Sequence, residues 1–498
     1  MQVLPVQLIF LIPLLPLIAG IACRGRDSVI AGRIAVIGAI LSTTVALLLV
    51  FFGESAVSHP MMLDAVASTM VLLVSFLGAV VLNYSRQYLA GDPRLSRFFS
   101  WMSLTLASVL TVVLAGHLLV LVGAWISTSL CLHRLLLHHP DRPGAVFSAR
   151  KKFVFSRAGD ICLLAASLLL YFNHGSWFLD DVFASIAAGN TGGLMLVGFL
   201  LVICAAMKSA QFPFHSWLPD TMETPTPVSA FMHAGIINAG GFLIVRFSPL
   251  YSHASAALIT LVIIGTISAA FGAVAMLVQP SVKRSLAYST IAQMGFMLLQ
   301  CGLGAYGLAM IHIVAHSLYK AHAFLSAGST IGVAPRAAIP LKTPALMVGV
   351  MVAVLLVMAG ATSLHVFMPL APAHSIVFLI VLSLAIAYGI ARATSAHTSL
   401  GMFAKSIGLA VVVAGLTFLL HAASNMLYEG LPVVKNAPWV LGFVGFVFVI
   451  LFLFQALMWR AQDYALGRWL YVHALNGFYV ATHANRLLGK LWPRHPIS

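Results

Sequence analysis

Apolar runs recur along the whole chain, separated by short stretches that hold glycine, proline and charged residues. Each run has about twenty residues, the length that a helix rising 1.5 Å per residue needs to cross a bilayer. The segments of a transmembrane β-barrel would alternate and would be only about ten residues long. We therefore predict an all-α polytopic membrane protein with about 15 transmembrane helices, the count lying between about 14 and 16. The expected spans are 3–22, 29–52, 61–82, 98–116, 118–137, 153–172, 192–222, 227–246, 255–278, 285–304, 305–333, 345–362, 374–391, 405–422 and 438–458.

The composition leaves no room for a soluble domain, since only 8% of the 498 residues are charged and 61% are hydrophobic. We expect one transmembrane bundle over 1–458 and an amphipathic tail over 459–498 on the cytoplasmic face, where docking of a partner is the alternative to lying on the membrane surface. The run at 3–22 follows no basic residues and is too long for the core of a signal peptide, so we interpret it as a retained span. The five cysteines show no metal-binding spacing, which is typical of core residues.

The basic residues are distributed unevenly between the two sides of the predicted membrane. All but four of the 27 Lys and Arg lie in connections after odd-numbered spans or in the tail. Arg246 and Lys435 lie on the other side, and Lys208 and Lys320 fall inside spans. Because basic connections stay in the cytoplasm, we predict the N-terminus outside and the C-terminus in the cytoplasm. This placement accounts for the net charge of +15, so no nucleic-acid partner is expected.

Lys208 lies near the middle of the segment 192–222, which is too long for one straight span. Pro213 follows it closely, so we predict a helix that is broken at Lys208. Freed backbone groups are tolerated in a membrane only where they face protein or a cavity. A lysine at the bilayer centre costs about 2.5–3.5 kcal/mol, which favours a functional role, while the alternative is a lysine that snorkels from a helix end.

A second group of titratable residues lies at i, i+4 and i+8 of one predicted helix: His312, His316 and Lys320. These side chains share a face at intervals of about 6 Å, too far apart for direct hydrogen bonds. Burial disfavours the charged forms of Lys and His, so such a stripe is suited to exchanging protons, although buried histidines also serve as hydrogen-bonded core residues. Water or nearby hydroxyls would have to bridge the stripe, those of Ser317, Tyr319 and Tyr288 being the candidates.

His233 lies a short way inside the next predicted span, among the small residues of HAGIINAGG. Small residues favour close packing of helices in membranes. We expect His233 to connect Lys208 with the histidine stripe if those spans pack together, and a packing histidine bonded to a carbonyl is the alternative.

These residues carry a resemblance to a known family. The stretch 208–235, the stretch SVKRSLAYSTIAQMGFMLL (281–299) and the HxxxHxxxK stripe resemble the antiporter-like proton-channel subunits of respiratory complex I and of Mrp cation/proton antiporters. Agreement is dense from about residue 100 to residue 333. The resemblance implies two inverted repeats of five helices, here about 98–246 and 255–391, each with a broken fourth helix and a polar axis at mid-membrane.

By the same resemblance, individual residues acquire roles in a proton path. Lys208 corresponds to the broken-helix lysine and His233 to the bridging residue, while His312, His316 and Lys320 form the central relay. Arg157 and Asp160 match an RxGD motif of the family, which we expect to form an i,i+3 ion pair.

Two departures from the family pattern stand out. Ile126 replaces the glutamate that usually pairs with the broken-helix lysine, and no obvious carboxylate takes its place. The second broken helix usually carries a lysine, but 361–375 offers only His365 and His374 as titratable groups.

These losses and the sequence of the tail resemble one branch of the family, the membrane subunits called DabB of inorganic-carbon accumulating complexes. The branch implies a multi-pass protein of the bacterial inner membrane, with no cofactor of its own, that passes protons or sodium. Its partner would be DabA, a peripheral cytoplasmic zinc protein resembling carbonic anhydrase, whose CO2 hydration the ion gradient drives. The alternatives are a pump subunit of an NADH-quinone oxidoreductase, a subunit of an Mrp-type antiporter, or a passive anchor for the partner. Complex I subunits of this type usually end in a long lateral helix and an anchoring span, for which the forty or so residues after 458 are too few.

The remaining polar groups carry weaker signals. Asp220 and Glu223 lie beside a proline turn, where they would take up protons or cap the next helix. The loop 133–152 holds three histidines without Cys or acids at ligand spacing, so we predict a basic cytoplasmic surface that faces lipid headgroups or an acidic partner, and no metal site. Since no catalytic or cofactor motif is present, we expect a transport subunit rather than an enzyme.

Overall fold

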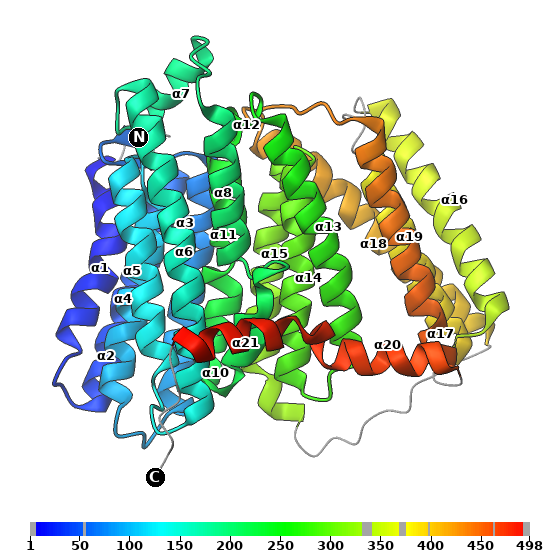
Figure 1. The fold of residues 1–498 in the computed structure, drawn as a ribbon, viewed down its shortest axis with the longest axis horizontal. Coiled ribbons are helices and arrows are strands. Elements are labelled where there is room, and N and C mark those ends of the chain that lie inside the picture. The colour runs from blue at the N-terminus through cyan, green and yellow to red at the C-terminus, as the bar shows by residue number, and fades with distance from the viewer. Residues whose placement is uncertain are drawn as a thin grey trace.

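The computed structural model describes residues 6–52, 56–330, 341–367, 375–396, 399–461 and 464–491, and in this part of the chain the fold is a bundle of long helices (Figure 1). A short hairpin of β1 (Ala56–Ser58) and β2 (Met61–Leu63) joins the second helix to the third. The long helices are α1 (Leu11–Ala22), α2 (Ser28–Phe52), α3 (Ala65–Tyr88), α4 (Leu95–Leu114), α5 (Leu118–Leu136), α6 (Pro143–His174), α8 (Leu194–Lys208), α13 (Ser255–Leu277), α14 (Val282–Gly302), α15 (Tyr306–Leu325), α16 (Thr343–Phe367), α17 (Ser375–Ala396), α18 (Leu400–Leu427) and α19 (Pro438–Ala461).

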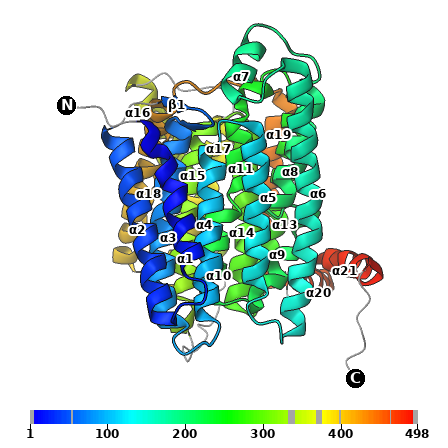
Figure 2. The ribbon, with the colours of Figure 1, turned by 90° about the vertical axis from the view of Figure 1, so that its left-hand side faces the viewer.

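Shorter helical segments complete the fold. The helix α7 (Leu179–Ala187) covers one end of the bundle, and α12 (Ser248–Tyr251) lies at the same end (Figure 1). The helices α20 (Ala465–Leu475) and α21 (Val480–Leu491) lie along one side of the bundle, toward its opposite end (Figures 1 and 2). The break after α8 contains α9 (Trp217–Asp220), and the next span consists of α10 (Thr226–Phe231), a π-helical turn (Met232–Ile236) and α11 (Ala239–Arg246).

Eleven of the described helices are long and apolar enough to cross a membrane, and two further apolar helices, Gln7–Ala22 and Leu194–Lys208, are shorter. Each expected span overlaps a helix of the structure. A polytopic all-α membrane protein is therefore confirmed, whereas the count of 15, the two inverted repeats and the orientation stay predictions.

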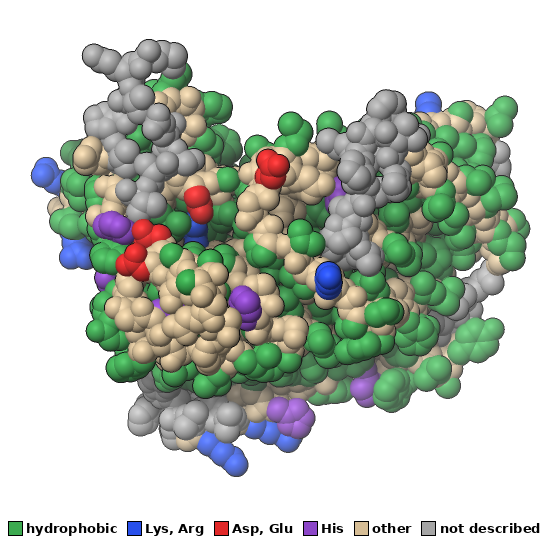
Figure 3. Space-filling model, turned by 90° about the horizontal axis from the view of Figure 1, so that it is seen from above, with side chains coloured by type: hydrophobic (Ala, Val, Ile, Leu, Met, Phe, Trp, Pro, Cys, Tyr) green, Lys and Arg blue, Asp and Glu red, His purple; other side chains and the backbone are tan. Residues whose placement is uncertain are grey.

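The two ends of the bundle differ in charge. The connections 23–27, 89–94, 137–142 and 278–281 lie at the end nearer to α20 and α21 (Figures 1 and 2). With the helix turns beside them, as 23–27, 86–97, 134–142 and 278–284, they hold nine Lys and Arg residues and three acids. Acidic side chains gather over α7, whose first turn holds Asp180 and Asp181, on the opposite face (Figure 3). This distribution is the one from which the sequence predicts a cytoplasmic C-terminus.

The span formed by α10, the π-helical turn and α11 lies at the centre of the bundle, where all of its most apolar 18-residue window is buried. The outer helix α18 is mostly exposed over the corresponding window, which is typical of a surface that faces lipid. Residues on the central span are consequently shielded from lipid on every side, and this span carries His233.

Asp64 ties the third helix to the end of the central span. Its carboxylate caps α3 by accepting a hydrogen bond from the Ala67 N–H at 2.8 Å, and it pairs with the Arg246 guanidinium, which is buried. Although partial burial acts to raise the pKa of Asp64, Arg246 and the Ala67 N–H outweigh it and hold the pKa below its usual value of 3.8.

We expect Asp64→Asn to lower the free energy of unfolding by about 3 kcal/mol, since it leaves the buried Arg246 unpaired while asparagine still caps the helix. Because the folded-state pKa of Asp64 is lowered, its contribution is present above the unfolded value and disappears as the pH falls through the folded value. Wild type and variant should therefore differ at neutral pH and converge below about pH 4. Thermal unfolding in detergent measures both effects, and Asp141→Asn, which removes an exposed ion pair, should change little.

Candidate ion path

The helix α8 ends at Lys208, as the sequence predicts, and the chain leaves helical geometry at Ala210, which has a φ of 51°. Side chains satisfy the backbone groups that the break frees. Trp217 Nε1 donates to the Met207 carbonyl at 3.3 Å, Gln211 Nε2 donates to the Ser209 carbonyl at 2.7 Å, and the Phe212 N–H donates to Ser268 Oγ at 3.0 Å. Ser209 Oγ in turn donates to the Ile237 carbonyl of the central span at 2.7 Å. The break is therefore held within the protein interior, where non-helical backbone is tolerated.

Lys208 lies between an aromatic ring and a carboxylate. Its Nζ is 4.4 Å from the centre of the Trp125 ring on α5, a distance that allows a cation–π interaction. Asp160 on α6 is close enough to interact with Lys208 electrostatically. Ile126, which follows Trp125, is partly buried and brings no charge.

Asp160 also forms the ion pair with Arg157 that the sequence predicts, with 2.6 Å between Arg157 Nη2 and Asp160 Oδ2. The sequence offers no obvious carboxylate for Lys208, and in the structure Asp160 interacts electrostatically with Lys208 in addition to pairing with Arg157. Sequence reasoning assigned Asp160 to Arg157 alone, since the packing of α6 against α8 is not visible in the sequence.

Lys152 also lies in the interior, and its assignment to a cytoplasmic loop was wrong. The helix α6 starts at Pro143, so Lys152 is already two turns inside it and faces α5. The ammonium group donates to Ser129 O at 2.8 Å and to Ser129 Oγ at 2.9 Å. Electrostatic interactions connect Lys152 with Lys208 and Asp160, so the three form one cluster of charged groups.

The predicted stripe occupies one helix, α15. The rings of His312 and His316 are 6.2 Å apart, and His316 and Lys320 are buried. Lys320 Nζ donates to Ser289 Oγ at 2.7 Å and to Leu286 O at 3.4 Å, so both of its partners are neutral. Electrostatic interactions link His316 with Lys320 and His233, which brings the central span into the same group.

Residues of α14 provide most of the partners of the stripe. His312 Nδ1 lies 2.8 Å from Gln300 Oε1, and His312 Nε2 lies 3.0 Å from Gln293 Oε1. Together with Ser289 and Thr290, these glutamines form a polar face that sequence reasoning missed. The signal was present as polar letters within SVKRSLAYSTIAQMGFMLLQ, but their direction depends on how α14 packs.

Close packing fixes the opposite side of α14 against α13. A Cβ atom added at Gly295 would lie 2.6 Å from Ala269 N, and one added at Gly272 would lie 2.6 Å from Ala292 N. The two backbones are thus in contact, as is common for small residues in membrane helices. With its glycines against α13, α14 presents its hydroxyl and amide groups to α15.

Ser317 and Tyr319, whose hydroxyls were predicted to bridge the stripe, make other contacts. Ser317 Oγ accepts a hydrogen bond from Asn238 Nδ2 at 2.6 Å and so connects α15 to the central span. Tyr319 is 58% exposed and offers Lys320 its ring, 5.2 Å from Nζ, rather than a hydrogen bond. Ser289 on α14, which was not among the predicted hydroxyls, is the hydroxyl that accepts a hydrogen bond from Lys320.

His233 lies in the π-helical turn Met232–Ile236, a local widening that is frequent at functional sites. Its Nδ1 lies 2.9 Å from Thr290 Oγ1, and its ring stacks on Phe324 with 4.4 Å between centres. The Nε2 atoms of His233 and His316 are buried and have no hydrogen-bond partner among the described residues. The predicted packing around Gly240 is confirmed, since an added Cβ would lie 2.7 Å from Ala205 O of α8.

The five predicted path residues form two groups, in which His233, His316 and Lys320 are buried and Lys208 and His312 are partly buried. The hydrogen bonds of the His233, His312 and Lys320 side chains go to residues of α14, and His316 is hydrogen-bonded to the backbone of His233. Two hydrogen bonds lie between the Lys208 group and the stripe. Ser209 Oγ donates to the Ile237 carbonyl, and Asn238 Nδ2 donates to Ser317 Oγ. The residues are neither exposed to lipid as a set nor separated by apolar side chains alone.

The end of the path near α21 holds a further charged group. Lys151 is buried, and its Nζ donates to Asp220 Oδ2 at 2.9 Å and to Asn485 Oδ1 at 2.8 Å. The predicted capping role of Asp220 and Glu223 is wrong, because neither side chain caps a helix: Asp220 pairs with Lys151 and Glu223 is exposed. Proton uptake by these acids stays a prediction.

His215 is a buried residue of the break that sequence reasoning did not select. Its ring lies 4.4 Å from that of Phe271, and its Nδ1 has no partner among the described residues. His215 also interacts electrostatically with Lys151. Its position in QFPFHSW (211–217), just after Lys208 and Pro213, was the available signal.

The tail packs onto the bundle through α20 and α21. Gln279 Nε2 donates to the Leu475 carbonyl at 3.2 Å, and the rings of Phe478 and Phe271 are 5.7 Å apart. With Asn485 on Lys151, these contacts place the tail directly over the break in α8. The side chain of His365 in α16 and the segment 368–374 lie outside the described residues. The structure therefore does not test whether the second broken helix lacks the lysine that the family resemblance implies.

Comparison with known families gives a match over the middle of the chain. Residues 115–385 match the family described as NADH:quinone oxidoreductase/Mrp antiporter, transmembrane, and residues 49–99 match the N-terminus of complex I chain 5. The first match covers more than half of the chain. The chain belongs to this family. The resemblance drawn from Lys208, His233 and the stripe is thereby confirmed at the level of the family.

Individual relatives narrow the similarity. The chain is 38% identical to "Probable inorganic carbon transporter subunit DabB2" of Halothiobacillus neapolitanus over 446 residues, covering 85% of this chain and 79% of that protein. It is 40% identical to "Probable inorganic carbon transporter subunit DabB" of Hydrogenovibrio crunogenus over 337 residues, covering 66% of this chain and 65% of that one.

A solved structure shares the fold. The Mrp complex from Dietzia sp. DQ12-45-1b contains a chain that is 25% identical, with a TM-score of 0.67, and the match covers 98% of this chain and 60% of that chain. The chain therefore spans about two thirds of the length of several proteins that it matches.

Proposed function

We propose that this protein is the proton-conducting membrane subunit of a complex that takes up inorganic carbon. The buried stripe of α15 and its partners on α14 carry the proposal, because a row of titratable groups with hydroxyl and amide partners has no structural need to exist in an apolar bundle. The similarity to proteins named as inorganic carbon transporter subunits supports the choice of cargo.

The stripe would conduct by passing protons between groups with neutral partners. Lys320 is held by Ser289 Oγ and a carbonyl, neither of which binds its proton as a carboxylate would. The unpartnered nitrogens of His233 and His316 are positions that bridging waters would satisfy, since buried polar atoms are rarely left without a partner. Sodium in place of protons is the alternative ion.

Lys151 and Asp220, beneath the tail, would form the cytoplasmic end of the path. From there His215, Lys208 and the Ser209 hydroxyl lead toward Asn238 and the stripe. Asp160 would balance the charge of Lys208 in place of the glutamate that Ile126 replaces. The route would thus run from the broken helix to α15 across the central span.

The partner would be a peripheral cytoplasmic zinc protein resembling carbonic anhydrase, and ion flow would make its hydration of CO2 effectively one-way. Purification of the tagged protein from native membranes tests this proposal. We expect a second subunit that contains zinc to co-purify and to be identified by mass spectrometry. Recovery of NADH-quinone oxidoreductase subunits or Mrp subunits instead would contradict it.

The rival of another class is a passive anchor, in which the interior path is inactive. An anchor would hold the partner equally well after any change to the stripe. Conduction and anchoring are therefore separated by whether variants of Lys320 retain the partner but lose ion movement.

A further inference from the structure

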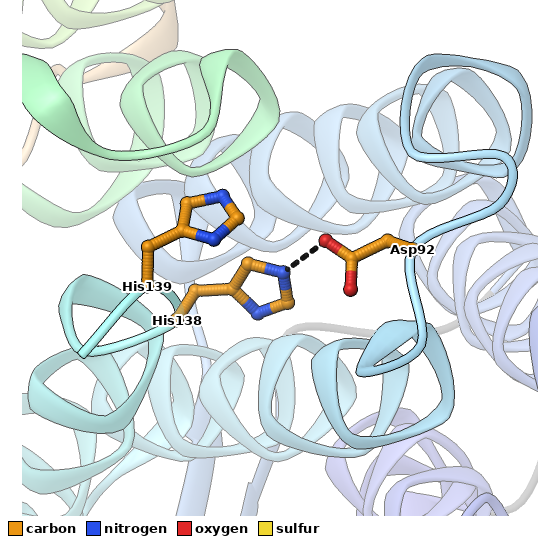
Figure 4. Close-up of side chains that lie close together, drawn as sticks. All are labelled: Asp92, His138 and His139. Carbon is orange, nitrogen blue, oxygen red and sulfur yellow. Dashed lines mark hydrogen bonds and ion pairs between the residues drawn. The ribbon is translucent and has the colours of Figure 1, made fainter. Parts of the chain in front are cut away.

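Two loops meet at the end of the bundle near α10, and their side chains converge there (Figure 4). Asp92 belongs to the connection between α3 and α4, while His138 and His139 belong to the connection between α5 and α6. One ligand atom from each of the three side chains lies within 4.8 Å of the others. Sequence reasoning excluded a metal here because the loop 133–152 has no acid at ligand spacing, and the fold brings that acid from a separate connection.

The three side chains are held in place by their surroundings. Asp92 Oδ1 accepts a hydrogen bond from the Arg94 N–H at 2.7 Å, which turns Oδ2 toward His138 Nε2, 2.9 Å away. His138 is buried, with 4% of its side chain exposed, and its ring packs against that of His139 with 4.7 Å between centres. Arg94 also donates to the His138 carbonyl at 3.1 Å and so clamps the two loops together.

We propose that Asp92, His138 and His139 form a binding site for a divalent transition-metal ion, Zn²⁺ by preference. Two imidazoles and one carboxylate are a ligand set that zinc uses, with water completing a tetrahedron. A hydrogen-bonded pair of Asp92 and His138 would account for two of the groups but not for the second imidazole brought against them. The charge of Arg94 is balanced by Asp141, 3.1 Å from Nη2, so that it does not oppose a bound cation alone.

The bound ion would fasten the connection between α3 and α4 to the connection between α5 and α6, and this inference does not depend on the proposed function. The test uses the full-length protein in detergent, freed of metal with a chelator and then titrated with Zn²⁺. We expect wild type to bind one more equivalent of zinc than His139→Ala, and the affinity of that site to fall by at least about 100-fold in the variant. His139→Ala keeps the hydrogen bond between Asp92 and His138, so the fold should survive.

His133→Ala is the matched control, because His133 lies in the same loop but bonds to the Ala149 carbonyl instead. It should bind zinc as wild type does. Cobalt provides a second readout, since Co²⁺ in a tetrahedral site has a visible absorption band. Wild type and His133→Ala should show this band, whereas Asp92→Asn and His139→Ala should not. If wild type and His139→Ala take up equal amounts of zinc with equal affinity, or show the same cobalt spectrum, the site does not exist.

Discussion

Cells that depend on this protein for inorganic carbon should lose energy-driven uptake when Lys320 is replaced by methionine. Methionine fills a similar volume but cannot carry a proton, and Ser289 loses its partner. Loss of a positioned proton carrier typically costs at least about 100-fold in rate, so accumulation of labelled bicarbonate should fall to the level of uncoupled wild-type cells. The amount of protein in the membrane should remain the same.

Lys435→Met is the control for this change, because Lys435 is an exposed lysine of the connection between α18 and α19. It should accumulate bicarbonate as wild type does. If Lys320→Met cells also accumulate bicarbonate normally, Lys320 does not carry the transported proton, and the stripe has only a structural role.

Asp160→Asn should produce the largest loss of stability among single substitutions in the interior. The change removes the carboxylate that faces Arg157, Lys208 and Lys152, and Asp160 itself is buried. Leaving buried cations without their partner costs about 3–5 kcal/mol, so the unfolding midpoint in detergent should fall well below that of wild type. Glu429→Gln, at an exposed acid, should unfold like wild type.

A second substitution tests whether Asp160→Asn lowers stability because the buried cations lose their balancing charge. Ile126 follows Trp125, the residue whose ring contacts Lys208, and it stands where the family resemblance leads us to expect glutamate. Ile126→Glu in the Asp160→Asn background should therefore regain a substantial part of the lost stability. If the double variant is less stable than Asp160→Asn alone, the carboxylate acts through its pair with Arg157 and not through Lys208.

The features that could be predicted from the sequence are those that depend on the spacing of residues within a single helix. The break at Lys208 follows from segment length and Pro213, and the stripe follows from the i, i+4, i+8 positions of His312, His316 and Lys320. Both are properties of a single helix, so no knowledge of packing is needed. Identification of the family depended on the same residues.

The features that could not be predicted depend on how separate helices meet. Ser289 and Gln293 reach α15 only because glycines set α14 against α13. The sequence predicts Lys152 in a loop because the start of α6 is not apolar, and Asp92 reaches His138 from a connection more than forty residues earlier. The π-helical turn at His233 has no sequence signal that we can name.

Proton flux into proteoliposomes is the direct test of whether the stripe that contains Lys320 conducts protons. The purified protein is reconstituted with a pH-sensitive dye inside, and a potassium diffusion potential drives protons inward. We expect vesicles with wild type or Lys435→Met to acidify, and vesicles with Lys320→Met not to acidify. Acidification by Lys320→Met at the wild-type rate, or wild-type vesicles no more permeable than empty ones, would contradict this expectation.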